Sequence, residues 1–153
     1  MDLADLITPE AIYPSLKAKT KKQALQEMAQ RASVLTGVDA REIFDTLLQR
    51  ERLGSTGIGR GIAVPHGRLA ALRKILSVFA RLEEPIEFEA LDGEPVDLIF
   101  LLLAPEHAGA DHLKALARIS RLLREPATID KLRASRDRAA IYSVLTEPAV
   151  HAA

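Results

Sequence analysis

The side chain best suited to covalent chemistry is His66, which follows Pro65 and precedes Gly67. Pro65 fixes its own φ angle and restricts the residue before it to extended backbone, so the imidazole stands on a constrained stretch of chain. Histidine can act as a nucleophile or as an acid–base group near neutral pH. A lone histidine is more often a hydrogen-bonded structural residue, but this rigid Gly/Pro setting favours a chemical role for His66.

Two other groups could act together with this histidine. His112 follows Asp111, the expected N-cap of a helix, and a helix N-terminus favours a nearby anion and a neutral ring. Arg50 and Arg52 end another expected helix just before a glycine-rich segment, and a guanidinium is well shaped to bind phosphate. Each has a plainer alternative: His112 as a first-turn surface residue, and the arginines as charges that complement the helix dipole.

The glycine-rich segment, residues 54–67, holds five of the chain's eight glycines. It is not a dinucleotide-binding loop, because Ile62 and Val64 stand where that pattern needs glycine, and it lacks the Gly-Lys-Ser/Thr of a P-loop. Backbone N–H groups in such a loop can form an anion-binding nest; a turn shaped only for packing is the alternative. The candidate phosphate-loop residues are Ser55, Thr56, Gly57, Gly59 and Gly61.

A metal site among Glu106, His107, Asp111 and His112 is disfavoured, because the two histidines are five residues apart, whereas four would align them on one helix face. Nucleic-acid binding is disfavoured too. Residues 114–138 contain eight bases against three acids, but they include no aromatic residue for stacking on bases. The excess positive charge of residues 114–138 is offset by residues 83–97, which contain seven acids and no base.

The composition is that of one ordinary soluble domain, expected to span residues 1–153 with a core at about 5–148. The 153 residues carry 21 Lys and Arg against 21 Asp and Glu, and the absence of Cys excludes disulfides and thiol nucleophiles. The acidic N-terminus is unlike a signal peptide. The longest strongly apolar run, residues 98–104, has seven residues where a membrane span needs about 20. We therefore expect a cytoplasmic protein.

The hydrophobic periodicity predicts an α/β (α+β) fold in which helices sandwich a single mixed β-sheet. The third helix should begin after Asp111, end at Pro126 and bury Leu113, Leu116, Ala117, Ser120 and Leu123. Other helices are expected at 21–35, 40–53, 127–134 and 138–145, and strands at 62–64, 74–81, 86–88 and 96–103.

The sequence from Arg50 to Gly67, Arg-Glu-Arg-Leu-Gly-Ser-Thr-Gly-Ile-Gly-Arg-Gly-Ile-Ala-Val-Pro-His-Gly, resembles the active-site signature of the enzyme IIA type-2 family of the bacterial phosphoenolpyruvate phosphotransferase system, the mannitol/fructose class. Within it, the chain is most similar to the stand-alone nitrogen-regulatory members. The resemblance implies that His66 accepts a phosphoryl group and that Arg50 and His112 flank it. Arg60 departs from the pattern, in which asparagine or another small polar residue is more usual.

What the resemblance implies is a phosphoryl relay that needs no cofactor, nucleotide or metal. The donor would be the phosphohistidine of an HPr-like carrier of the nitrogen branch, charged ultimately from phosphoenolpyruvate. Family members use Nε2, although the sequence alone does not select between the two ring nitrogens of His66. The absence of a fused IIB domain and of a membrane segment favours regulation of targets such as potassium-transport or sensor-kinase proteins. The alternatives are a soluble IIA subunit that relays phosphate to a fructose- or mannitol-type transporter, and a non-catalytic regulatory binding module.

Overall fold

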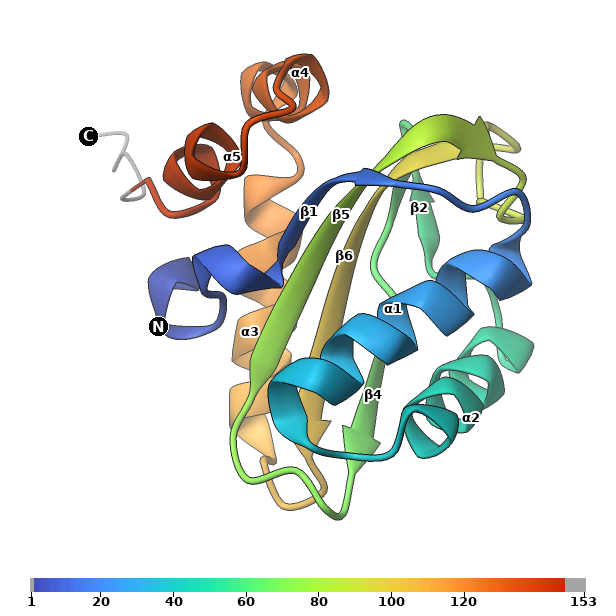
Figure 1. Ribbon diagram of the computed structural model, residues 1–153, viewed down its shortest axis with the longest axis vertical. Coiled ribbons are helices and arrows are strands. Elements are labelled where there is room, and N and C mark those ends of the chain that lie inside the picture. The colour runs from blue at the N-terminus through green and yellow to red at the C-terminus, as the bar shows by residue number, and fades with distance from the viewer. Residues whose placement is uncertain (1, 148–153) are drawn as a thin grey trace.

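A mixed six-stranded sheet forms the centre of the computed structural model, which describes residues 2–147 (Figure 1). Met1 and residues 148–153 of the expected domain lie outside the described residues. The strands are ordered β1-β5-β6-β3-β2, and β4 also pairs with β6. Their bounds are β1 Ile12–Leu16, β2 Gly57–Gly59, β3 Ile62–Ala63, β4 His66–Leu69, β5 Leu76–Ile86 and β6 Val96–Pro105.

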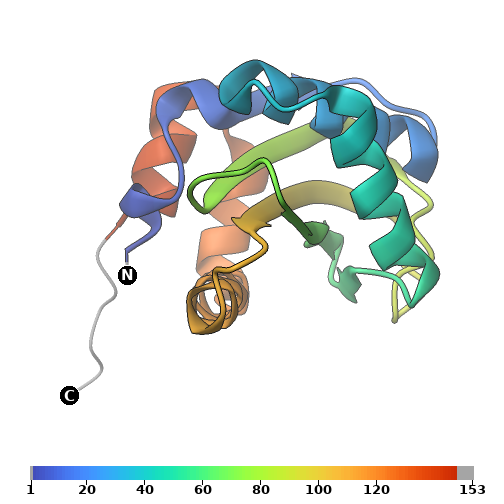
Figure 2. The ribbon, with the colours of Figure 1, turned by 90° about the horizontal axis from the view of Figure 1, so that it is seen from below.

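Helices cover both faces of this sheet, which confirms the predicted sandwich. Figure 2 shows α1 and α2 on one side and α3 on the other, while α4 and α5 lie beyond the end of α3. No helix within residues 2–147 is both long and apolar enough to cross a membrane. The bounds are α1 Lys21–Thr36, α2 Ala40–Arg52, α3 Ala110–Leu122, α4 Pro126–Ala134 and α5 Arg138–Leu145, with short 3-10 turns at Leu3–Asp5 and Pro9–Ala11.

Strand β6 is the predicted apolar run, and every residue in it except Asp97 is buried. It runs antiparallel to β5 along one edge. Along its other edge it pairs in parallel first with β3 and then with β4, so that His66 lies opposite Leu102. A strand enclosed by partners on both edges and helices on both faces needs no polar face, which explains the unbroken hydrophobic sequence.

The first two helices begin where the sequence predicts. The side chain of Thr20 accepts a hydrogen bond from the Gln23 N–H at 3.1 Å and so caps α1. Helix α1 ends at Gly37, which has a φ of 75°. Helix α2 buries Ile43, Phe44 and Leu47 against the sheet, as its amphipathic spacing indicates.

The predicted strands need correction in three respects. The expected separate strand at 86–88 is wrong: β5 continues to Ile86, and a register shift after Arg81 accommodates Pro85. Strand β1 was not predicted; it is short, contains Pro14 and pairs in parallel with β5 at the edge of the sheet, where proline is tolerated. The glycine-rich segment contains the short strands β2 and β3 and the start of β4 rather than one strand.

The predicted start of α3 is also wrong, and its predicted buried face is only partly correct, since Leu123 is buried and Leu116 packs against the core. Gly109 rather than Asp111 occupies the N-cap position, and the helix ends at Leu122, before Pro126, which instead begins α4. Leu113, expected inside, is 66% exposed. The buried face is displaced by one residue and consists of His112, Ala115 and Ile119, followed by Leu123.

Candidate functional site

Helix α2 approaches β4 closely enough to place Arg50 beside His66. A Cβ atom added to Gly67 would lie 2.7 Å from the methyl group of Thr46, so the close approach requires glycine at this position. Thr46 and Arg50 are four residues apart and therefore lie on one face of α2. With Thr46 over Gly67, the next turn of the helix carries Arg50 to the neighbouring residue, His66.

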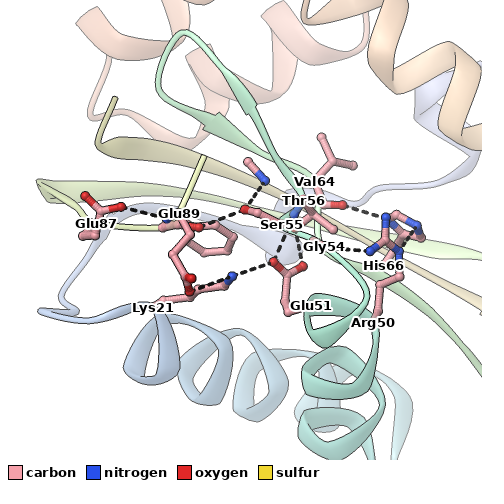
Figure 3. Close-up of polar contacts among 12 residues, drawn as sticks. Lys21, Arg50, Glu51, Gly54, Ser55, Thr56, Val64, His66, Glu87 and Glu89 are labelled. Atoms are coloured by element: carbon pink, nitrogen blue, oxygen red, sulfur yellow. Dashed lines mark hydrogen bonds and ion pairs between the residues drawn. The ribbon is translucent and has the colours of Figure 1, made fainter. Parts of the chain in front are cut away.

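The hydrogen bonds of His66 define its tautomer. Nδ1 lies 2.8 Å from the Val64 carbonyl oxygen, and because a carbonyl only accepts, Nδ1 carries the ring proton. Nε2 then has a lone pair, and it accepts a hydrogen bond from Arg50 Nε at 3.2 Å. Arg50 is itself held through Nη1, which donates to the Gly54 carbonyl at 2.9 Å (Figure 3). The geometry therefore leaves Nε2 as the nucleophilic nitrogen of a neutral ring.

Burial is the main reason that the pKa of His66 lies below its ordinary value. The Val64 carbonyl opposes this shift by stabilising the protonated ring, whereas the charge of Arg50 adds to it, and Glu51 acts weakly in the raising direction. The net effect keeps the imidazole neutral near pH 7. A neutral ring is the form with a lone pair available for attack.

The second predicted histidine lies beside the first. His112 is on the inner face of the first turn of α3, only 6% exposed, and its ring packs edge-on against His66 with 5.8 Å between centroids. Its Nδ1 accepts a hydrogen bond from Arg68 Nε at 3.0 Å. Burial first, then the charges of Arg68 and His66, lower the pKa of His112. Within residues 2–147, its Nε2 is buried and has no hydrogen-bond partner.

Arg68 is the polar member of this cluster that the sequence analysis missed. It lies two residues after His66 on β4, and residues two apart on a strand share a face. The two-residue spacing from His66 could identify Arg68 from the sequence, but only if a strand is known to begin at His66. The structure thus brings together two histidines and two arginines, from α2, β4 and α3.

The loop between α2 and β2 is stabilised by a buried carboxylate rather than left open for an anion. Glu51 accepts hydrogen bonds from both the N–H and the hydroxyl of Thr56, and it forms an ion pair with Lys21 at 3.1 Å (Figure 3). The Ser55 hydroxyl donates to the Phe88 carbonyl and accepts from the Gly57 N–H. The hydroxyls of Ser55 and Thr56 and the N–H groups of Thr56 and Gly57, all in the predicted phosphate loop, thus already have partners within the protein.

Gly59 and Gly61 lie at the opposite end of the segment from His66, in what we call the hairpin tip, residues 59–61. Arg60 there has a φ of 57°, and its N–H donates to Asp92 at 2.9 Å. Its guanidinium donates to the carbonyls of Leu123 and Arg124 at the end of α3, at 3.0 and 3.2 Å. The structure does not bring these two glycines to the histidines.

Arg133 completes the hairpin tip from helix α4. It binds the carboxylate of Asp97 through Nε and Nη2, with a shortest distance of 2.8 Å, and it also donates to the Arg60 carbonyl. Gly61 has a φ of 79°, and a Cβ atom there would collide with the Arg133 guanidinium. The glycine therefore serves the packing of the hairpin against α4.

Over the described part of the chain, no three or more His, Asp or Glu side chains are grouped so as to hold a metal ion. Glu106 and His107 are exposed in the β6–α3 connection, whereas His112 is buried beneath Arg68.

The chain is similar to known proteins over nearly its whole length. Residues 5–147 match the family described as phosphoenolpyruvate-dependent sugar phosphotransferase system, EIIA 2. The nitrogen regulatory protein of Bradyrhizobium diazoefficiens is 62% identical over 153 residues, which is 100% of both chains. The crystal structure of nitrogen regulatory protein IIA-Ntr from Neisseria meningitidis has a TM-score of 0.89 at 31% identity and covers 94% of this chain and 99% of that one.

Sugar-specific members share the fold. The crystal structure of IIA mannitol from Escherichia coli has a TM-score of 0.76 at 23% identity, over 90% of this chain and 97% of that one. The resemblance first noted between Arg50 and Gly67 is confirmed by these matches, and among them the nitrogen regulatory proteins are the more similar. The chain belongs to the EIIA type-2 family of the phosphoenolpyruvate-dependent phosphotransferase system, a family of phosphocarriers.

Proposed function

We propose that this protein accepts a phosphoryl group on Nε2 of His66 from the phosphohistidine of an HPr-like carrier of the nitrogen branch. The observation that carries the proposal is the pair of hydrogen bonds on the His66 ring, Nδ1 to the Val64 carbonyl and Nε2 from Arg50, which leave a neutral ring with its lone pair on Nε2. The similarity to nitrogen regulatory proteins supports the choice of branch.

In the proposed transfer, the Nε2 lone pair of His66 attacks phosphorus in line as the N–P bond of the donor breaks. The donor ring, protonated on its other nitrogen, takes the electron pair of the N–P bond and leaves as neutral imidazole, while His66 keeps its Nδ1 proton and becomes positively charged. The Val64 carbonyl stabilises that charge through the 2.8 Å hydrogen bond. Arg50 Nε, released from Nε2, donates instead to a phosphoryl oxygen, where charge develops.

Regulation would follow from the charge that the phosphoryl group adds, about −1.5 to −2 near neutral pH. The chain starts from a formal net charge of zero, so one phosphoryl group changes both its net charge and the face around His66. We propose that regulatory targets, such as potassium-transport or sensor-kinase proteins, distinguish the two forms by this change.

Incubation with phosphoenolpyruvate, enzyme I and the nitrogen-branch carrier tests the relay. Wild-type protein should acquire an acid-labile phosphoryl label, and His66→Ala should abolish it. His107→Ala, which changes an exposed histidine outside the cluster, is the matched control and should label normally. Undiminished labelling of His66→Ala would remove the assignment, and failure of wild type to label would favour a non-catalytic binding module.

A second experiment separates regulation from sugar transport. Labelled protein is offered fructose- and mannitol-type IIB domains, and efficient transfer to either would favour a transporter subunit. In parallel, a pull-down compares wild type, His66→Ala and His66→Asp for partners that bind one charge state. Partners retained equally by all three would argue against a phosphorylation switch.

A further inference from the structure

Arg68 connects three segments of the cluster. It extends from β4 on the same strand face as His66 and donates from Nε to His112 Nδ1 in the first turn of α3, at 3.0 Å. Its Nη1 also lies 3.5 Å from the carbonyl of Glu106, in the connection between β6 and α3. Arg68 is itself exposed, whereas the ring that it contacts is buried.

This contact determines which nitrogen of His112 carries the proton. A guanidinium only donates, so Nδ1 of His112 must present its lone pair, and the proton of the neutral ring lies on Nε2. His112 therefore has the opposite tautomer to His66, whose proton lies on Nδ1. One ring has its lone pair on Nε2, and the other has an N–H donor there.

The Nε2–H group of His112 is available to a new hydrogen-bond acceptor. Among the residues that the structure describes, Nε2 of His112 is buried and without a hydrogen-bond partner, an arrangement that costs stability and calls for an explanation. The two rings pack edge to face with 5.8 Å between their centroids, so a phosphoryl group on His66 would be the nearest new acceptor. The unpaired donor is what that acceptor requires.

We propose that Arg68 is a positioning residue, which holds His112 in the Nε2–H tautomer so that the ring donates a hydrogen bond to a phosphoryl group on His66. The mechanistic part of this inference rests on the proposed relay. Without Arg68, the His112 ring is free to move its proton to Nδ1, which would turn a lone pair instead of a donor toward the phosphoryl oxygens.

Long-range ¹H–¹⁵N NMR of the imidazole nitrogens tests the tautomer directly. Wild type and Arg68→Lys, which keeps a cationic donor, should show His112 protonated on Nε2, whereas Arg68→Ala should shift the ring toward Nδ1–H. Arg73→Ala, at an exposed arginine further along the chain, is the control and should match wild type. An unchanged tautomer in Arg68→Ala, or an Nδ1–H ring in wild type, would overturn the proposal.

Phosphoryl-transfer kinetics test the consequence. Residues that orient metal-binding histidines typically contribute about tenfold to a hundredfold. By analogy, we expect Arg68→Ala to slow labelling by about that factor and Arg68→Lys by less. In a His112→Leu background, the same change should have no further effect. An equal slowing in that background would mean that Arg68 acts on the phosphoryl group or the carrier directly, against the proposal. The NMR measurement needs no phosphoryl donor, so it separates failure of the relay from failure of the role of Arg68.

Discussion

The two ends of the glycine-rich segment use arginines in opposite ways. At the hairpin tip, Arg60 and Arg133 bind backbone carbonyls and the Asp97 carboxylate, and they tie the tip to α3 and α4. At the other end, residues 64–67, Arg50 and Arg68 each donate to an imidazole nitrogen. A carbonyl or a carboxylate is a permanent partner, whereas the His66 Nε2 lone pair that Arg50 contacts could be exchanged for a bond to phosphorus. One short stretch of chain thus has an end held by permanent contacts, the structural end, and an end that the proposed relay would use, the reactive end.

The largest effect is expected from Arg50→Ala at the reactive end. Removing a donor that stabilises transferred charge should slow phosphoryl transfer to His66 by about 10² to 10³, which corresponds to about 3 to 4 kcal/mol. Stopped-flow or quenched-flow labelling measures the rate. Arg52→Ala, which removes an exposed arginine at the same helix end, is the matched control. An equal slowing in both variants would mean that general positive charge matters rather than the contact with His66.

At the structural end, Gly61→Ala should lower the free energy of unfolding by about 2 to 3 kcal/mol, because it combines an unfavourable φ with a collision against Arg133. Gly93→Ala is the control: its φ is 73°, but no atom lies within 4 Å of the added Cβ, so about 1 kcal/mol is expected. Urea unfolding measures both. Equal losses would show that Arg133 moves away without cost.

Arg60→Ala is expected to cost less, about 1 kcal/mol, because it removes two hydrogen bonds from an exposed side chain to the end of α3. The rate of labelling at His66 should not change. Urea unfolding and the transfer rate, measured in parallel, test these two expectations. Slower transfer at unchanged stability would contradict the division into a structural and a reactive end. It would imply that the hairpin tip affects the position of the histidines through α3.

The two histidines should make the free energy of unfolding depend on pH. The folded pKa values of His66 and His112 lie below the ordinary 6.5, so below that pH the unfolded chain binds more protons. Their stabilising contribution is complete above about pH 6.5 and is lost as the pH falls through the lowered folded values. Urea unfolding at several pH values measures the slope. The double variant His66→Gln/His112→Gln should have a smaller slope, and an unchanged slope would contradict this attribution.

Much of the reactive end could be predicted because it depends on local sequence. The Pro65-His66-Gly67 setting and the helix whose last turn carries Arg50 can be predicted from the order of residues alone. Arg68 was missed because its role depends on two facts that no local pattern contains: a strand that begins at His66, and an imidazole from a distant helix within reach. The role of Arg68 therefore follows from tertiary contacts and not from local sequence propensity.

The error in α3 has a physical cause of the same kind. The pattern favoured Leu113 as a core residue because it is strongly apolar, and Asp111 as a helix cap because aspartate commonly occupies that position. The structure instead buries His112 and the small Ala115 against the sheet and leaves Leu113 in solvent. In this helix, burying His112 beside His66 takes precedence over burying the most hydrophobic face.

Strand β4 fixes His66 within the sheet, through its register with Leu102 and the 2.9 Å hydrogen bond from the Leu102 N–H to the Pro65 carbonyl. In the proposed relay, this placement means that the acceptor His66 cannot swing from one protein to another, as a mobile arm would. Donor and recipient must therefore occupy the same surface in turn, and each excludes the other. Initial-rate kinetics of the proposed relay are therefore expected to take the ping-pong form, with parallel lines in a double-reciprocal plot.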